Sequence, residues 1–515
     1  MYSINLNQFK MKKLIFTLVT IVLFSKSSTA TIWNVGPTLT YTMPSQVKNL
    51  VMDGDTIFIA GGIYSNDATK WTKKNLKFIG LGTGSSRTIL QYTGDIPNGK
   101  GIFVFEIPGT TDNPYLENIV FDGAKISDAN GANGAGIRFQ ANNMTVVNCK
   151  FINCQNGILE GNGSVTTSNV VIQNSEFENN GYQLPNDPTF SGYEHNIYIS
   201  ASTDTLIVKN CYFHRPRGQA NSLKTRAQRS YILYNLIDEE ATGYGSWELN
   251  IAQGGLNVIM GNIIIQGSSG ANHGIISYDA TTNALEDFYF INNTVINKYN
   301  GNIKYFNISP PSGINTFKIY NNIFASVSGA SNTMFGTNIP ASLDSATNRT
   351  ILNYLSFGFN NPSTNDFSLV SSATSAINKG SFAGVTNTAY GLTPNYMYQS
   401  YTMALLPRTI ASGTIDIGAY EFTSPTSVAE FQLTSPVSVY PNPSSGKFSI
   451  NNDQWKPEEK HTIEMYNING EKINYVGSLT THSLYEIDLS SYPKGIYYLK
   501  ITKDNEVWNS KVILQ

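Results

Sequence analysis

The chain has 515 residues and a formal net charge of −2. Charged residues make up 14% of it, against about a quarter in an average protein, and this balanced total gives no support to nucleic-acid binding. The 43 glycines and 30 tyrosines favour β-structure with many turns over helical bundles.

The N-terminus carries an export signal. From Met11 the basic start MKK is followed by eleven apolar or small residues, LIFTLVTIVLF, and then by the small-residue stretch SKSSTA. This order is typical of a secretory signal peptide, with cleavage predicted near Ala30. The alternative is a membrane anchor, but a membrane-spanning helix needs about twenty apolar residues. We therefore expect residues 1–30 to be removed, no membrane span and an exported, soluble protein.

A repeated phrase fills the next four hundred residues. Two or three alternating apolar residues are followed by Asn and by a further apolar residue, as in VVIQNSEF and LIVKNCYF. Copies lie 25 to 36 residues apart, a period that fits one coil of a parallel β-helix; a β-propeller blade needs about 40 residues or more. The marker asparagines are Asn118, Asn148, Asn174, Asn210, Asn235, Asn262, Asn292 and Asn321. We expect Asn148, Asn174, Asn210 and Asn235 to stack in one column along the coil axis.

Both ends of this repeat region resemble a known group. The opening TIWNVGPTLTYTMPSQVKNLVMDGDTIFIAGGIY (31–64) resembles the first coil of secreted right-handed β-helix proteins of the pectate-lyase type. The segments AINKGS (376–381) and DIGAYEF (416–422) are similar to the last coils of the same group. The resemblance implies a right-handed parallel β-helix over residues 31–425, which we expect to be the catalytic domain.

The C-terminal part has a different pattern. Residues 426–436 form a predicted linker rich in Ser, Thr and Pro. From residue 437, alternating strands separated by Pro-Asn-Pro, Asn-Gly and Pro-Lys-Gly turns predict a small antiparallel β-sandwich. The motifs YPNP, GIYYLKI and KVILQ resemble the sorting domain of the bacterial type IX secretion system. The resemblance implies that residues 437–515 engage that machinery; a carbohydrate-binding module is the alternative.

One stretch gathers positive charge. Between Thr205 and Ile237 there are six Lys or Arg residues and no Asp or Glu, which favours an anionic partner. Strand alternation places Leu223 and Thr225 inside the helix, so that Lys224 and Arg226 face outward. The same rule predicts four further outward side chains: Asn196, Tyr198, Glu248 and Asn250. His195 begins its strand, and His214 and Arg217 are expected in the loop that leads to the next strand.

This patch suggests a site for an acidic polysaccharide. β-Elimination on a uronic acid requires a base for the C5 proton and a cation for the carboxylate, and the planar Arg226 fork suits the carboxylate. Lys224 can be the base only if its pKa falls; Arg226 would lower that pKa and Glu248 would raise it, and either can prevail. His195 or Tyr198 are alternative bases, or the acid toward the leaving O4. The substrate-binding candidates are Asn196, Arg217, His214, Glu248 and Asn250.

The paired phrases HNIYI and SLKTRA are similar to those of secreted β-helix proteins grouped with polysaccharide lyases. This resemblance implies functional roles for five residues: His195, Asn196, Tyr198, Lys224 and Arg226. No cofactor is certain. Pectate-lyase-type helices often bind Ca²⁺ through clustered Asp, which this chain lacks, so calcium would have to use Glu160, Glu194 and Glu248.

Other functions fit the same fold. A C5-epimerase would use the same chemistry as a lyase. A glycoside hydrolase needs two carboxylates in one cleft, and Glu160 and Glu248 would lie about 14 Å apart by strand spacing, which is too far. A surface glycan-binding protein would need no chemistry at all. Finally, Lys224 and Arg226 could belong to a surface ion-pair network with Glu248 and the acidic run 238–240.

Overall fold

The computed structural model describes residues 30–515 except 108–111, 162–166, 182–191, 272–273, 281–282, 284, 400–402, 411–412, 424–436, 453–460, 468–470, 480–483 and 504–505. The expected signal peptide (apart from Ala30) and the expected linker lie outside the described residues. The chain divides into two compact units, with the boundary between Phe422 and Thr423. We describe each unit by itself.

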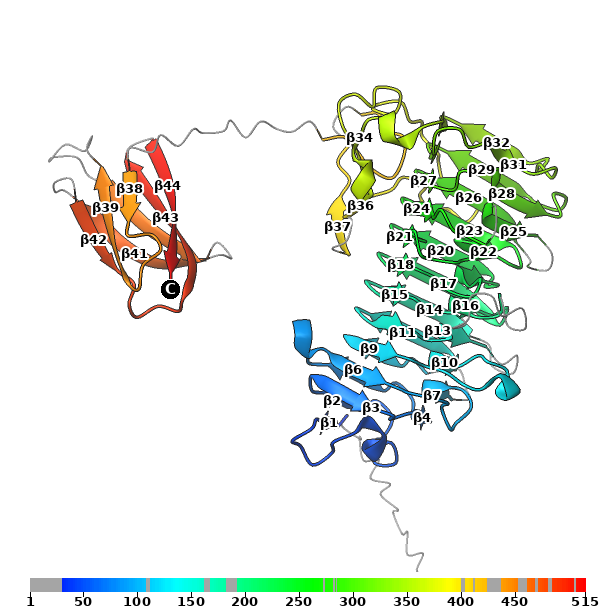
Figure 1. The fold of residues 1–515 in the computed structure, drawn as a ribbon, viewed down its shortest axis with the longest axis horizontal. Helices are drawn as coiled ribbons and strands as arrows, with labels where there is room; N and C mark the ends of the chain where they lie inside the picture. Colours follow the sequence, from blue (N-terminus) through cyan, green and yellow to red (C-terminus); the bar gives the residue numbers. More distant parts are fainter. Residues whose placement is uncertain are drawn as a thin grey trace, which may run out of the picture. The chain divides into compact units, whose positions relative to one another are not determined.

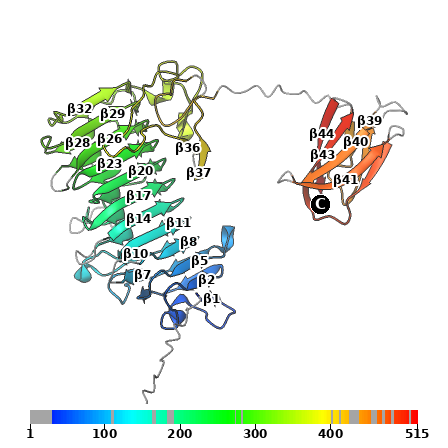
Figure 2. The same ribbon diagram turned by 180° about the vertical axis from the view of Figure 1, so that it is seen from behind.

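The first unit is a stack of coils, and each complete coil gives one strand to each of three parallel sheets (Figures 1 and 2). In the described residues these sheets have ten, twelve and eleven strands. Successive coils hydrogen-bond in parallel; β16, for example, pairs with β13 on one side and with β19 on the other. The prediction of an all-β chain with a parallel β-helix is therefore confirmed.

The ten-stranded sheet consists of β4 (Thr69–Trp71), β7 (Gly101–Glu106), β10 (Ala135–Gln140), β13 (Asn156–Glu160), β16 (His195–Ile199), β19 (Asn221–Thr225), β22 (Leu249–Ile251), β25 (Gly274–Asp279), β28 (Ile303–Ser309) and β31 (Asn332–Phe335). The twelve-stranded sheet consists of β1 (Ile32–Val35), β2 (Thr56–Ile59), β5 (Lys77–Gly80), β8 (Tyr115–Glu117), β11 (Asn143–Val147), β14 (Thr167–Gln173), β17 (Thr203–Lys209), β20 (Arg229–Leu233), β23 (Gly255–Met260), β26 (Glu286–Ile291), β29 (Thr316–Tyr320) and β32 (Leu343–Ala346).

The eleven-stranded sheet consists of β3 (Gly62–Ser65), β6 (Thr88–Gln91), β9 (Ile119–Asp122), β12 (Lys150–Ile152), β15 (Glu176–Glu178), β18 (Tyr212–His214), β21 (Leu236–Asp238), β24 (Ile263–Gln266), β27 (Thr294–Asn297), β30 (Ile323–Ser326) and β33 (Arg349–Ile351). Short 3₁₀ helices lie between strands; they are η1 (Pro44–Val47), η2 (Gly84–Ser86), η3 (Asp128–Asn130), η4 (Tyr354–Ser356) and η5 (Pro362–Thr364).

Aromatic residues fill part of the interior one coil at a time. Phe121, Phe151, Phe177 and Phe213 stack with ring centroids 4.8–5.1 Å apart and nearly parallel planes. Their spacing matches the separation of neighbouring β-strands, about 4.8 Å. One inward apolar residue at the same place in each repeat is thus enough to build a continuous core.

The marker asparagines form two columns, so the prediction of one column is wrong. Asn148, Asn174 and Asn210 adopt the left-handed backbone conformation with φ of 50–54°, and Asn210 Nδ2 donates to Asn174 Oδ1 at 2.7 Å. In the next coil Tyr234 takes this position with φ of 55°. Asn235 therefore lies one residue further on. It starts a buried amide ladder in which each Nδ2 donates to the next Oδ1 through Asn262, Asn293, Asn322 and Asn348.

The end of the first unit covers two of the three sheets. It contains the paired strands β34 (Phe359–Asn361) and β35 (Asp366–Leu369), and β36 (Tyr396–Gln399) and β37 (Ala404–Pro407). Phe367, Tyr398 and other apolar residues of this segment pack on the outer side of the eleven-stranded sheet, and Ala383 and Leu392 pack on the twelve-stranded sheet. The described apolar residues of this C-terminal segment therefore pack on the eleven-stranded and twelve-stranded sheets and not on the ten-stranded sheet.

The second unit has two antiparallel sheets. One contains β38 (Val437–Tyr440), β39 (Lys447–Asn452) and β42 (Leu484–Asp488); the other contains β40 (His461–Asn467), β41 (Lys472–Leu479), β43 (Gly495–Lys503) and β44 (Glu506–Leu514). Phe448 and Ile450 of the first sheet share a buried core with Ile463 and Leu499 of the second. The small antiparallel unit predicted from the turn motifs is therefore confirmed.

Candidate functional site

Strand alternation breaks near the start of each site strand. Ile137, Ile158 and Ile197 align along the ten-stranded sheet, so the residues before them, Gly136, Gly157 and Asn196, also form a column. A Cβ atom built on Gly157 would lie 2.9 Å from Phe177 Cδ1 in the core. This column therefore points inward, and two consecutive residues face the interior before normal alternation resumes.

This break corrects two predicted site residues. Asn196 is fully buried, and its Oδ1 accepts a hydrogen bond from the buried Asn180 Nδ2 at 2.9 Å. Glu248 occupies the same column two coils later, because Leu223 pairs with both Ile197 and Leu249. Burial and the nearby Glu239 raise the pKa of Glu248 well above its usual range. Neither side chain belongs to the outer face.

Beyond the break the outward prediction holds, and four residues come together. Lys224 pairs with Tyr198 of the previous coil. Lys224 Nζ lies 5.7 Å from the centroid of the Tyr198 ring, and Arg226 Cζ lies 6.0 Å from it. The His195 and Tyr198 rings are stacked with centroids 5.8 Å apart. We call His195, Tyr198, Lys224 and Arg226 the cationic site.

The hydrogen bonds of His195 make its imidazole an uncharged hydrogen-bond donor beside Tyr198. The backbone N–H of Asn221 donates to His195 Nδ1 at 3.2 Å, and a backbone amide can only donate, so the ring proton of the neutral imidazole is on Nε2. Burial, Lys224 and Arg226 lower the pKa of His195 well below its ordinary value. Of the two roles considered for His195, the donor role fits this hydrogen-bond network.

The electrostatics of Lys224 depend on a residue that the sequence prediction missed. Burial and Arg226 lower the pKa of Lys224, while Asp279 opposes them. The opposing carboxylate is therefore Asp279, at the end of β25, and not Glu248. Burial raises the pKa of Asp279, and Lys224 and Arg226 lower it. The outward position of Asp279 could have been predicted from the alternating strand GIISYD, in which Asp279 lies two residues after the outward Ser277.

Asp279 attracts the two cations of the site but forms no ion pair with either of them. In the part of the chain that the structure describes, no carboxylate forms an ion pair with Lys224 or Arg226, although both side chains are half-buried. The Arg226 Nε atom is buried without a hydrogen-bond partner. Two partly buried cations beside a single carboxylate leave one positive charge uncompensated, which is costly, so this arrangement indicates a place for an anion.

The acidic run 238–240 is engaged elsewhere, which contradicts the predicted surface network with Lys224 and Arg226. Asp238 Oδ2 accepts from Asn365 Nδ2 at 2.6 Å. Glu239 accepts the backbone N–H groups of two glycines, and burial raises its pKa to about 7. Glu240 Oε1 lies 2.9 Å from His214 Nδ1.

Two further neighbours lie on the outer face. Arg138, Leu159, Tyr198, Lys224 and Asn250 follow one another along successive strands. Arg138 is half-buried, and its Nη2 donates to the Gly161 carbonyl at 3.3 Å. Asn250 keeps its predicted outward place beside Lys224, and its Oδ1 is buried without a partner. Arg138 escaped the sequence prediction because it lies outside the acid-free stretch.

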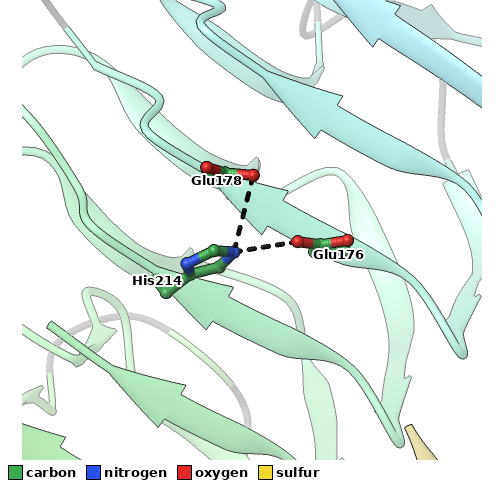
Figure 3. Close-up of side chains that lie close together, drawn as sticks. All are labelled: Glu176, Glu178 and His214. Carbon is green, nitrogen blue, oxygen red and sulfur yellow. Dashed lines mark hydrogen bonds and ion pairs between the residues drawn. The ribbon is translucent and has the colours of Figure 1, made fainter. Parts of the chain in front are cut away.

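The two remaining predicted residues, Arg217 and His214, have no described contact with the cationic site. Arg217 bridges Gly181 in a turn, and burial lowers the pKa of its guanidinium. His214 ends strand β18 of the eleven-stranded sheet, so its expected position in a loop beside the site is wrong. Its Nε2 lies 3.0 Å from Glu176 Oε1 and 3.9 Å from Glu178 Oε2 (Figure 3).

Among the described residues, Glu176, Glu178 and His214 form the one group of acidic, Cys or His side chains close enough to share a metal ion. Lys150 Nζ lies 3.0 Å from Glu176 Oε1 and also pairs with Glu178, which Arg215 contacts as well. Burial raises the pKa of the Glu176 carboxyl, but hydrogen bonds from His214 and Lys150 outweigh this effect and lower the pKa to about 2. Since cations already neutralise both carboxylates, this group is an ion-pair network.

The predicted calcium ligands do not form an outer-face site either. Glu160 aligns with the inward Phe139, and its two oxygens accept from Ser200, Thr203 and Thr167 at 2.7–3.0 Å. Glu194 is fully buried. Because Glu160 and Glu248 both face inward, they also provide no carboxylate pair for glycoside hydrolysis.

Comparison with known proteins identifies the second unit. Residues 438–515 match the family model of the secretion system C-terminal sorting domain. The protein is therefore secreted through the type IX system to the cell surface or the exterior, and the secretion machinery is one of its partners. No curated protein matches the chain. Within the described residues, no helix has the length and apolar character needed to cross a membrane.

Proposed function

We propose that the protein is a secreted polysaccharide lyase that cleaves a uronic-acid polymer by β-elimination. The observation that supports this proposal is the half-buried pair Lys224 and Arg226, with which no carboxylate of the described residues forms an ion pair. Asp279 lies near enough to attract both cations, but it supplies only one negative charge for two positive ones. The carboxylate of a uronic acid carries the missing charge. The proposal assigns the site to an acidic sugar because the same face also offers uncharged hydrogen-bonding groups from Tyr198 and His195.

Each group then has one task. Arg226 binds the C6 carboxylate and stabilises the charge that grows on it as the C5 proton leaves. Lys224, with its lowered pKa, takes that proton as the uncharged amine. The C4–O4 bond breaks, the C4=C5 double bond forms, and the Tyr198 hydroxyl gives its proton to the departing O4. His195 donates from Nε2 to the substrate.

The test is a panel of pectate, alginate, glucuronan and glycosaminoglycans incubated with the purified secreted chain. The proposal predicts new ultraviolet absorbance from an unsaturated uronic acid with at least one polymer. Inversion at C5 without new ultraviolet absorbance would show that the protein is a C5-epimerase and not a lyase. Binding with neither reaction would leave a glycan-binding protein, and reducing ends without absorbance would favour a hydrolase.

A further inference from the structure

A hollow lies on the same outer face as the cationic site. Its volume is about 490 Å³, and its lining includes Trp247, Gly274, Asn302, Lys304, Asn307 and Thr333. All of these residues belong to, or adjoin, strands β22, β25, β28 and β31 of the ten-stranded sheet. None of them contributes to the cationic site.

The strand register connects the hollow to the cationic site. Lys224 pairs with Asn250, Asn250 with Ser277, and Ser277 with Asn307, which lines the hollow. Three strand spacings separate Lys224 from Asn307, a distance of about 14 Å. A polymer that lies along this column and reacts at Lys224 would therefore reach the hollow with a sugar residue beyond the cleaved linkage.

Trp247 gives the hollow an aromatic wall. The indole is half-exposed and lies directly against Gly274 of the next coil, where a Cβ atom would come within 2.5 Å of the ring. Any other residue at position 274 would displace the ring, so Gly274 is what allows the indole to rest on the sheet. An aromatic surface of this kind suits the apolar C–H face of a pyranose.

Lys304 gives the hollow its charge. It pairs with Gly274 on one side and with Thr333 on the other, and its side chain is exposed. Among the carboxylates of the described residues, none forms an ion pair with Lys304. The ammonium group is therefore available to the carboxylate of a sugar seated on Trp247.

We infer that this hollow is a remote subsite for the same acidic polysaccharide, in which Trp247 stacks on a uronic acid residue and Lys304 binds its carboxylate. The inference rests on the proposed function and extends it by naming where the polymer runs. Binding energy at such a distance can improve catalysis on long chains. Discrimination between long and short substrates should therefore depend on Trp247.

The test measures binding without turnover. Affinity electrophoresis in gels that contain each polymer of the panel compares Lys224→Ala with the double variants that also carry Trp247→Ala or Lys304→Ala. Loss of the aromatic anchor Trp247, which a bound sugar would cover, should weaken binding about tenfold or more. Loss of an exposed cation should weaken it about threefold, and the effect should vanish at high salt. Lys77→Ala, exposed on the twelve-stranded sheet, is the matched control, and Trp247→Phe, which keeps a ring, should bind more tightly than Trp247→Ala.

The possible results separate the two proposals. If the subsite variants bind as tightly as their parent on a polymer that the active protein cleaves, the subsite is wrong and the lyase proposal stands. If Trp247→Ala weakens binding but no polymer is cleaved, the subsite is supported and the lyase proposal fails. If the unsubstituted protein neither binds nor cleaves any acidic polymer, the subsite and the lyase proposal are both overturned. Melting temperatures equal to that of the parent show that the variants are folded.

Discussion

The backbone N–H of Asn221 donates to His195 Nδ1 across the gap between two neighbouring coils, at 3.2 Å. This hydrogen bond fixes the tautomer of the neutral imidazole, with the ring proton on Nε2. Burial, Lys224 and Arg226 also lower the pKa of the ring, so His195 stays uncharged at neutral pH. The parallel β-helix thus sets the chemistry of one residue through the backbone of the next coil.

The donor role of His195 predicts a graded loss of activity. Replacement by Ala removes one hydrogen bond to a charged or developing-charge group, worth roughly 1.5–3 kcal/mol, so kcat/KM should fall about ten- to hundredfold. His195→Gln keeps an N–H donor and should lose less. The measurement is initial rate on the cleaved polymer. Equal losses for the two variants would contradict a donor role.

Asp279 should set the pH dependence of the reaction. Lys224 acts as a base only when unprotonated, so the rate should rise as pH increases through its pKa. Asp279 favours the protonated form and raises that pKa. Asp279→Asn should therefore shift the rising limb of the kcat/KM profile to lower pH.

The control for this shift is Asp344→Asn, which removes a carboxylate of the twelve-stranded sheet that pairs with Lys318. Its pH profile should match that of the parent. A shift of the Asp279→Asn profile to higher pH, or no shift, would show that Lys224 is not the base.

The buried amide ladder should contribute to stability. Asn262 Nδ2 donates to the Ile232 carbonyl at 2.9 Å, and Asn262 Oδ1 accepts from the Asn235 backbone N–H at 2.9 Å. Asn262→Ala would orphan both groups in the interior, each at a cost of roughly 1–3 kcal/mol. We expect a clear fall in melting temperature. Replacement of the exposed Asn300 by Ala is the control and should change the free energy of unfolding by no more than about 0.5 kcal/mol. An equally small change for Asn262→Ala would show that the ladder does not contribute to stability.

Deletion of residues 437–515 should block export without unfolding the β-helix. The two units are separate in the chain and have separate buried cores. Immunoblots of cell fractions should find the truncated chain in the periplasm, and the purified truncated chain should melt cooperatively. Release of the truncated chain at the level of the full chain would refute the need for the sorting domain.

The sequence predicted the outer face well where alternation is regular. Lys224, Arg226, Tyr198 and Asn250 lie outward as expected, since each follows the inward residue of a regular strand. Asn196 and Glu248 were placed outward because the prediction assumed regular alternation. Each directly precedes an inward residue of its strand and faces inward as well, and apolar periodicity does not reveal this break. A buried Asn or Glu there also contradicts the usual polarity of the interior.

The marker column failed for a related reason. Asn235 follows Tyr234 directly, and the two later markers Asn292 and Asn321 each have a second Asn beside them, so the repeat could be aligned in two ways that differ by one residue. The left-handed φ of Tyr234 decides between them. His214 was misplaced because its strand belongs to another sheet, and only the coil geometry separates it from Lys224.

The most direct test of the central claim compares Lys224→Ala and Arg226→Ala with the parent and with Lys77→Ala on a polymer that the parent cleaves. Charge stabilisation of this kind is worth roughly 3–4 kcal/mol, so each site variant should lose about a hundredfold or more of the rate of absorbance increase. Lys77→Ala should keep the parental rate, and all melting temperatures should agree. Parental turnover in both site variants would contradict the account and place the chemistry elsewhere on the molecule.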